Sequence, residues 1–136
     1  MKLVVDTNIL FSFFWEKSFT KRILTSNRFT LLTPDTAITE LKKYTQEIIK
    51  KTGLSLQAFE KQMKILKATI KIIPKKTLSD FIARADEISP DKDDAPFLAL
   101  CLRENCVLWS NDALLKNQDK INVINTEEII NILQDY

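Results

Sequence analysis

Five short apolar segments recur along the chain, and segments of helical periodicity separate them. Short apolar runs of this kind predict buried strands. Strands that alternate with helices are typical of a parallel sheet that is covered on both faces. The sequence therefore predicts one α/β domain over residues 1–136. We expect its strands at Lys2–Val5, Phe29–Thr33, Ile70–Ile73, Cys106–Trp109 and Ile121–Ile124.

The intervals between these runs predict amphipathic helices, because their apolar residues are spaced three and four apart. Ser18 and Thr126 are the residue types that cap helix N-termini, and Gly53 is typical of a helix end. We expect helices over Asn8–Phe14, Ser18–Ser26, Asp35–Gly53, Ser55–Ile70, Leu78–Ile88, Asp94–Asn105, Ala113–Lys116 and Glu127–Leu133.

The composition fits a globular protein, with 45% hydrophobic and 28% charged residues. A single glycine excludes a Gly-rich phosphate-binding loop. The apolar stretch Ile9–Trp15 is too short to span a bilayer, and no signal peptide is expected. The two cysteines, five residues apart, fit neither a disulfide framework nor a zinc knuckle. We therefore expect a cytoplasmic protein with reduced thiols and no membrane partner.

The chain contains no histidine. This excludes a Ser-His-Asp triad, a Cys-His nucleophile and a zinc site with histidine ligands. If the protein is an enzyme, carboxylates, lysine, tyrosine, hydroxyl groups or water must transfer its protons and bind its metals. The search for a site is thereby narrowed to acidic residues.

The net charge of +2 hides an uneven distribution. Residues 40–76 contain ten lysines and three glutamates, a net charge of +7, while the remainder has ten basic and fifteen acidic residues, a net charge of −5. Such a basic segment suits an anionic polymer, since lysine and arginine make most phosphate contacts. The same lysines also suit the solvated faces of long helices, and charge patterning alone supports both interpretations.

Four acidic residues are predicted to meet at one edge of the sheet. Asp6 and Asp112 follow two of the predicted strands, and Glu40 and Asp94 lie in early turns of helices that start on the same side. The carboxyl ends of parallel strands share an edge, where function gathers. Neighbouring carboxylates repel unless a cation lies between them, and oxygen ligands alone favour Mg²⁺ or Mn²⁺.

Each acid also has a structural interpretation. Asp6 and Asp112 could cap helices or turns, and Glu40 could be a solvated helix residue. Within the cluster of acids at residues 91–94, at least one belongs to a hydrophilic loop. We expect Asp93 not to contact the metal directly, because adjacent side chains at a helix start diverge. The pattern of four acids at one edge is stronger evidence than any one of them.

Three motifs and one glutamate carry a family resemblance. They are Val4–Leu10 (VVDTNIL), Glu40, Asp91–Leu100 (DKDDAPFLAL) and Ser110–Leu115 (SNDALL). In this order and spacing the chain resembles the PIN domain, and more narrowly it is similar to VapC-type ribonucleases, the toxin halves of prokaryotic toxin–antitoxin pairs. The resemblance covers nearly the whole chain.

The resemblance implies a three-layer α/β/α fold with a mainly parallel central sheet, and Mg²⁺- or Mn²⁺-dependent endoribonuclease activity. It assigns Asp6, Asp94 and Asp112 as metal ligands and Glu40 as a further catalytic acid. It gives supporting roles to Thr7, Asn8 and Ser110. It also implies an RNA substrate, a cognate antitoxin and a homodimer. Lysines proposed to guide the RNA backbone are Lys42, Lys43, Lys61 and Lys64.

Two residues depart from the family pattern. Trp109 replaces a smaller β-branched residue and could alter the floor of the site, and Cys101 replaces a small alanine in the expected core.

Two other functions compete with this interpretation. An aspartyl phosphatase would need a second Asp two residues after Asp6, where Asn8 stands, and a receiver domain would need an acidic pair before Asp6. A catalytically silent RNA- or protein-binding module with the same fold would need none of the acids, and their presence argues against it.

Overall fold

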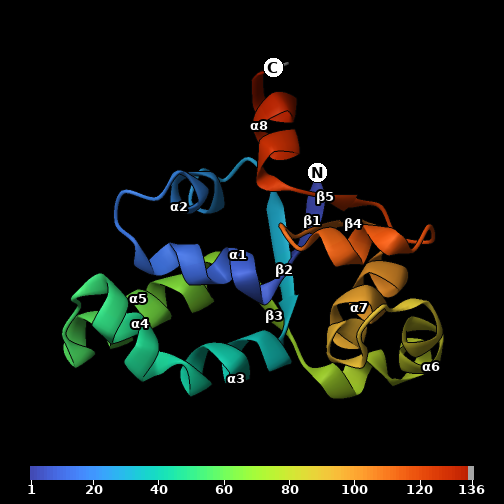
Figure 1. Ribbon diagram of the computed structural model, residues 1–136, viewed down its shortest axis with the longest axis horizontal. Helices are drawn as coiled ribbons and strands as arrows, with labels where there is room; N and C mark the ends of the chain where they lie inside the picture. The colour runs from blue at the N-terminus through green and yellow to red at the C-terminus, as the bar shows by residue number, and fades with distance from the viewer. Residues whose placement is uncertain (135–136) are drawn as a thin grey trace.

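A five-stranded parallel sheet runs through the centre of the computed structural model, which describes residues 1–134 (Figure 1). The strand order is β3-β2-β1-β4-β5, so β1 is the middle strand. In register, Leu3 of β1 lies opposite Leu31 of β2 and Val107 of β4. The strands are β1 Lys2–Val5, β2 Thr30–Pro34, β3 Lys71–Ile73, β4 Val107–Trp109 and β5 Val123–Ile124.

Helices cover both faces of the sheet, which gives the three-layer α/β/α architecture that was predicted (Figure 1). On one side lie α1, α2, α4 and α5, on the other α6 and α7, and α3 starts where β2 ends. The helices are α1 Thr7–Phe11, α2 Phe19–Leu24, α3 Asp35–Lys43, α4 Thr45–Thr52, α5 Leu56–Thr69, α6 Ser79–Ile88, α7 Ala95–Glu104 and α8 Thr126–Gln134. Short 3₁₀ turns are η1 Ser12–Phe14, η2 Lys75–Leu78, η3 Lys92–Asp94 and η4 Ala113–Asn117. None of the helices described is both long and apolar enough to cross a membrane.

The core contains residues of the sheet, of α7 on one face and of helices such as α1 and α5 on the other. The side chains of β1 from Leu3 to Val5 are fully buried, and seven consecutive residues of α7, from Ala95 to Cys101, are buried as well. A helix that is apolar around most of its circumference must pack on several neighbours, and α7 contacts β1, β2, β4 and α6. Cys101 is a core residue, as expected. Trp109 is buried too, and its indole N–H donates to Thr126 Oγ1 over 3.1 Å.

The predicted helix from Asp35 to Gly53 is wrong in one respect, because it is two helices with a break at Tyr44. Tyr44 has φ −100° and ψ 18°, outside the helical values, and no glycine or proline marks the break in the sequence. Its ring packs edge-on against Phe11, with centroids 5.8 Å apart. Tertiary packing has therefore overridden helix propensity, which is a weak force per residue. Gly53 ends α4 at φ +75°, as predicted.

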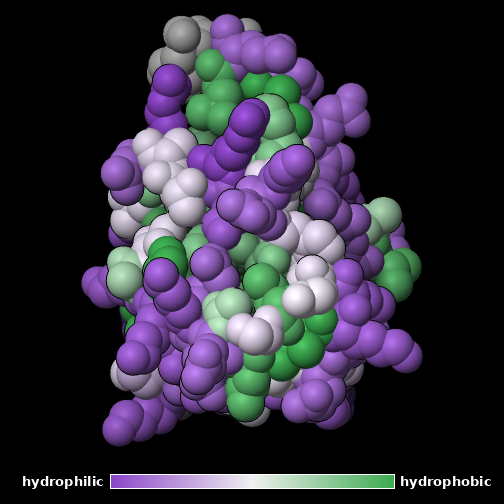
Figure 2. Space-filling model, turned by 90° about the vertical axis from the view of Figure 1, so that its left-hand side faces the viewer, coloured by the Kyte–Doolittle hydropathy of each residue, from purple (hydrophilic) through white to green (hydrophobic). Residues whose placement is uncertain are grey.

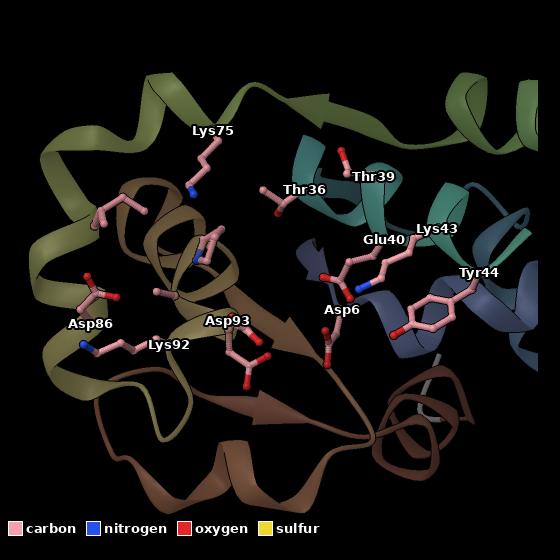
Figure 3. Close-up of a pocket in the computed structure, with 14 residues that line it drawn as sticks. Asp6, Thr36, Thr39, Glu40, Lys43, Tyr44, Lys75, Asp86, Lys92 and Asp93 are labelled. Carbon is pink, nitrogen blue, oxygen red and sulfur yellow. The ribbon is translucent and has the colours of Figure 1, made fainter.

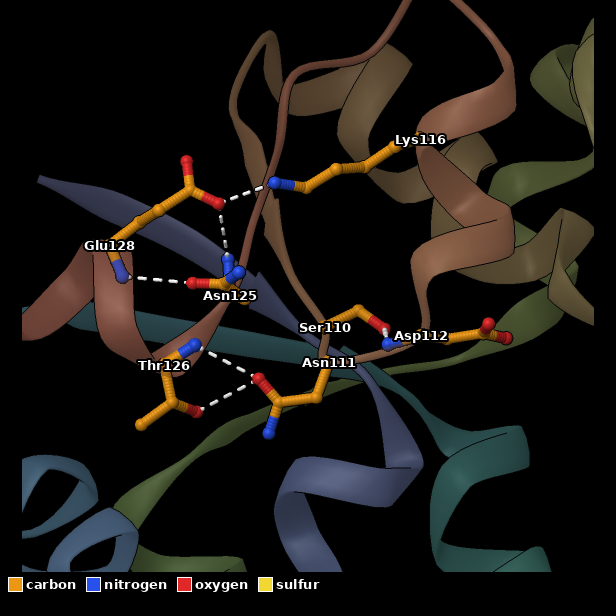
Figure 4. A network of polar contacts seen from close by, with 7 residues as sticks. All are labelled: Ser110, Asn111, Asp112, Lys116, Asn125, Thr126 and Glu128. Atoms are coloured by element: carbon orange, nitrogen blue, oxygen red, sulfur yellow. Dashed lines mark hydrogen bonds and ion pairs between the residues drawn. The ribbon is translucent and has the colours of Figure 1, made fainter.

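Thr126 does not cap the last helix, contrary to expectation. Asn125 does, because its Oδ1 accepts from the Glu128 N–H over 2.9 Å while Glu128 Oε1 accepts from the Asn125 N–H over 3.2 Å (Figure 4). This reciprocal pair is a capping box. The hydroxyl of Thr126 is thereby free to contact Trp109 and Asn111.

Candidate active site

Asp6 is fixed at the carboxyl end of the central strand, with only 7% of its surface exposed. Its Oδ1 accepts from the Thr7 N–H over 2.8 Å, and its Oδ2 accepts from the Ser110 hydroxyl over 2.6 Å. Its own N–H donates to the Trp109 carbonyl of the adjacent strand over 3.0 Å. Asp6 is thus both the cap of α1 and a carboxylate held at the sheet edge.

Thr7 joins α1 to α3 at this edge. Its hydroxyl donates to Glu40 Oε1 over 3.4 Å, and the threonine itself is buried. Glu40 lies in the sixth position of α3 and is half-buried. This contact turns the Glu40 carboxylate towards Asp6, as Figure 3 shows.

The loop after β4 brings Asp112 to the same edge (Figure 4). The Ser110 hydroxyl that donates to Asp6 also accepts from the Asp112 N–H over 3.0 Å. Asp112 Oδ1 caps η4 by accepting from the Leu114 N–H over 3.0 Å, which leaves its other oxygen free for a ligand. Ser110 therefore couples the positions of two acids.

Asn111 ties this loop to α8. Its Oδ1 accepts from the Thr126 N–H over 2.9 Å and from the Thr126 hydroxyl over 3.1 Å (Figure 4). Sequence analysis did not assign this role to Asn111, because the contact joins residues fifteen apart.

Asp94 precedes α7 and faces the other three acids. Asp91 caps the preceding turn by accepting from the Asp93 N–H over 3.0 Å. In residues 1–134, no hydrogen bond reaches the Asp94 carboxylate. Asp93 lines the same cleft as Asp94. That Asp93 does not contact the metal directly stays a prediction.

Burial and mutual repulsion raise the pKa values of three of these acids, Asp6, Glu40 and Asp94. Burial, followed by the charges of Asp6, Asp91, Asp112 and Glu40, raises the pKa of Asp94 from 3.8 to about 7. Burial also raises the pKa of Asp6 and of Glu40 above their ordinary values, although hydrogen bonds from Ser110 and Thr7 oppose the shift. Such perturbed acids gather at functional sites.

The donor set fits a hard divalent cation. All four groups are carboxylates, and none of the ion pairs within residues 1–134 involves Asp6, Glu40, Asp94 or Asp112. Their negative charge is thus unbalanced by the protein, which is the environment that Mg²⁺ or Mn²⁺ neutralises. In the described chain, no three acidic or cysteine side chains are already close enough together to hold an ion.

Two hollows meet at these acids, and their walls differ in chemistry. Both are lined by Asp6, Glu40, Tyr44 and Asp94. The first, of about 580 Å³, is the cleft in Figure 3 and carries the cations Lys43, Lys75 and Lys92. The second, of about 520 Å³, includes Thr7, Asn8 and Asp112, and its aromatic residues are Phe11, Trp15 and Tyr44.

The predicted lysines are only partly found at the site. Lys43 lines the first hollow, whereas Lys42, Lys61 and Lys64 do not line either hollow in the part of the chain that the structure describes. Lys75 and Lys92 take their place. Lys75 follows the end of β3, and Lys92 lies within the DKDD motif. Their positions next to a strand end and next to a predicted site acid are the sequence signals that could have identified them.

Comparisons with known proteins agree with this architecture. The family model described as "PIN domain" matches residues 4–133. The structure titled PAE2754 from Pyrobaculum aerophilum is similar with a TM-score of 0.73 and 15% identity, covering 100% of this chain and 91% of that one. VapBC2 from Rickettsia felis, bound to a DNA fragment from its promoter, is similar with a TM-score of 0.61 and 17% identity, covering 92% and 98%. No curated protein matches the sequence.

Proposed function

This chain belongs to the PIN domain family, and from that premise we propose that it is a metal-dependent endoribonuclease. One observation carries the proposal: four carboxylates from separate segments line the second hollow, and no protein cation within residues 1–134 forms an ion pair with any of them. Unpaired acids at the carboxyl edge of a parallel sheet are costly to stability. A bound divalent cation is the ligand that offsets this cost.

In the proposed site, Asp6, Asp94 and Asp112 hold the cation, which when bound supplies a water of lowered pKa next to an RNA phosphodiester. Ser110 sets the spacing of Asp6 and Asp112, because one hydroxyl contacts both residues. Glu40 Oε1 is engaged by Thr7, so Oε2 is the atom that accepts the proton of the attacking water. The raised pKa of Glu40 suits a base that works near neutral pH. The attacking water oxygen would form a bond to phosphorus while the P–O3′ bond breaks and O3′ takes up a proton from solvent, which leaves 5′-phosphate and 3′-hydroxyl ends.

The first hollow, which shares Asp6, Glu40 and Asp94 with the second, has the cations to position the substrate. Lys43, Lys75 and Lys92 line it, and none of the three forms an ion pair within residues 1–134. Free ammonium groups around a carboxylate centre suit a polyanion whose scissile phosphate reaches a metal. We place the RNA backbone along these three lysines, rather than along Lys61 and Lys64 of α5.

The fold shared with VapBC2 of Rickettsia felis supports a toxin–antitoxin role. On that basis the proposed nuclease is the toxin of such a pair, with a separate antitoxin chain as its inhibitor. A homodimer in the cytoplasm is part of the same proposal.

The test is cleavage of single-stranded and hairpin RNA with Mg²⁺ or Mn²⁺ and with excess chelator. We expect metal-dependent cleavage and 5′-phosphate ends. Asp6→Asn keeps the volume of the side chain but removes a ligand charge, and should abolish cleavage. Asp119→Asn, in an exposed loop, is the matched control and should retain full activity. Cleavage in excess chelator, or 2′,3′-cyclic phosphate products, would refute the metal-water route. A folded protein that cleaves no RNA would instead favour the alternative function, a catalytically silent RNA- or protein-binding module.

A further inference from the structure

The two cysteines of the chain meet where α7 ends and β4 begins. Asn105 ends α7 in the left-handed conformation, at φ 50°. The Cys101 carbonyl accepts from the Asn105 N–H and, over 3.2 Å, from the Cys106 N–H. A helix end of this kind usually brings the side chains at these two positions together, and apolar residues are common there. In this chain both positions hold free thiols, and the two side chains are in hydrogen-bonding contact.

The two thiols differ in access and in environment. Cys101 is 1% exposed, whereas Cys106 is only partly buried. Burial, and then the hydrogen bond to Cys106, raises the pKa of the Cys101 thiol above its ordinary value. The hydrogen bond from the Cys101 thiol is the main cause that lowers the pKa of Cys106. The charge of Lys2 and the N–H of Val4 act in the same direction, while burial and the Glu104 carboxylate oppose them.

This pair lies away from the other features of the molecule. It sits where β1 and β4 begin, at the edge of the sheet opposite to the one where Asp6 and Ser110 follow these strands. The face that carries α2, α4 and α5 has a hydrophobic area in its lower half (Figure 2), and these helices cover the side of the sheet opposite to α7 (Figure 1). Copies that associate through that area would leave α7 on the far side of the sheet. The nearest partner for the Cys106 sulfur is thus Cys101 of the same chain.

A partly exposed cysteine whose thiolate is stabilised, with a second thiol beside it, is the arrangement of redox-sensitive cysteines. We propose that Cys106 is a site of oxidation by peroxides and that Cys101 closes an intramolecular disulfide with it. The inference is independent of the proposed RNA cleavage. The bond encloses only residues 102–105 and fastens the end of α7 to the start of β4.

The chemistry takes place in two steps. The Cys106 thiolate attacks one peroxide oxygen, the O–O bond breaks, and the hydroxide that leaves takes up a proton to become water. The Cys101 sulfur then attacks the sulfur of the resulting sulfenic acid. The S–S bond forms, the S–O bond breaks, and the hydroxyl group leaves with the Cys101 proton as a second water. The two thiols together lose two electrons and two protons, and one peroxide molecule is reduced.

The test exposes the full, reduced chain to hydrogen peroxide in the presence of chelator and under native conditions. Intact mass, free-thiol content and a non-reducing gel are measured over time. We expect both thiols to disappear together, the mass to fall by two hydrogens, and no covalent dimer to form. Dithiothreitol should restore both thiols.

Two variants separate the roles of the sulfurs, and circular dichroism checks that each is folded. Cys101→Ala keeps a small residue in the core and leaves Cys106 without its partner. Its Cys106 should accumulate sulfenic acid, which dimedone traps, and should then form sulfinic acid or disulfide-linked dimers. Cys106→Ser should leave the Cys101 thiol unreacted, because the core shields it from peroxide.

A matched pair of lysine variants tests the environment of Cys106. Lys2→Gln removes the cation beside the sulfur and leaves Glu104, its partner at 3.2 Å, unbalanced. It should slow the oxidation several-fold, since the thiolate is the species that reacts. Lys71→Gln removes the same charge from the exposed first residue of β3 and should leave the rate unchanged.

Thiols that both survive excess peroxide in the folded protein would overturn the inference and identify the pair as an ordinary apolar contact at a helix end. Disulfides formed only between chains would also overturn it. So would oxidation of Cys101 in Cys106→Ser at the rate of the parent protein, because it would mean that the reaction needs unfolding. None of these measurements depends on cleavage, so the inference and the proposed function can fail separately.

Discussion

The Asp94 carboxyl group keeps its proton to about pH 7 in the folded protein but loses it near pH 4 when the chain unfolds. Between these values the folded state binds more protons than the unfolded state. The free energy of unfolding must therefore fall as pH rises through this window. Asp6 and Glu40, whose pKa values are also raised, contribute with the same sign.

Asp94→Asn should reduce this dependence on pH, with Asp6 and Glu40 left to contribute the remainder, and should cost activity. Because Asp94 is half-buried and solvent screens its charge, we expect a stability gain of about 1–2 kcal/mol at pH 8 and almost none at pH 4. Urea unfolding at both pH values measures the effect. Asp119→Asn is the control and should change neither value. A variant that is less stable than the parent at pH 8 would contradict the assigned repulsion.

At the scale of elements, the loop that carries Asp112 is positioned by α8. Asn111 accepts two hydrogen bonds from Thr126, and Asn125 caps the same helix through Glu128. Both asparagines stabilise the N-terminus of α8, yet only Asn111 also orients the loop.

Asn111→Ala and Asn125→Ala should therefore differ in activity but not in stability. Each should lower the free energy of unfolding by about 1–2 kcal/mol, the usual cost of a lost helix cap. Only Asn111→Ala should reduce RNA cleavage, by roughly tenfold or more, through displacement of Asp112. Urea unfolding and initial cleavage rates measured with saturating Mg²⁺ check both statements. Equal activity in the two variants would show that α8 plays no part in positioning the site.

At the scale of the whole molecule, the distribution of lysines determines in which orientation the chain binds a polyanion. The basic segment of the sequence is spread over α3, α4, α5 and η2, and only a few of its lysines line the hollows. Net charge attracts RNA from any direction, whereas a lysine at the cleft contributes to one bound geometry.

Lys75→Glu with Lys92→Glu should weaken RNA binding and reduce its salt dependence by about one to two counterions. Lys61→Glu with Lys64→Glu, on the exposed side of α5, is the control with the same change in net charge. We expect this control to have a much smaller effect at physiological salt. The slope of log Kd against log salt concentration distinguishes the two pairs. Identical slopes would mean that only the overall charge matters.

The sequence predicted the strands because their signal is local. Each apolar run of β1 to β5 was found within one or two residues, and the acid after β1 followed from it. The break at Tyr44 was missed because its cause is a ring from α1, and nothing in the local sequence marks it. The lysines that line the first hollow, Lys75 and Lys92, were not singled out for a similar reason, since charge counts ignore which residues border a cleft.

The four acids were within reach of sequence reasoning because strand ends and helix starts converge in any parallel sheet. The hydrogen bonds that hold these acids in place could not be predicted from the sequence. The link from Ser110 to Asp6 joins residues 104 apart, and the second hollow combines residues of α1, α3 and α4. Distances between side chains of this kind depend on packing, which periodicity does not encode.

The central place of β1 also has a consequence for how the protein is made. Strand β1 pairs with β4, whose residues follow about a hundred positions later, and β4 leads directly into the Asp112 loop. During translation one edge of β1 stays unpaired until β4 has emerged. The carboxylate site therefore cannot assemble before residue 112 has been made, and a ribosome that stalls earlier releases a fragment that lacks part of the site. The proposed activity thus depends on synthesis of the chain through this loop.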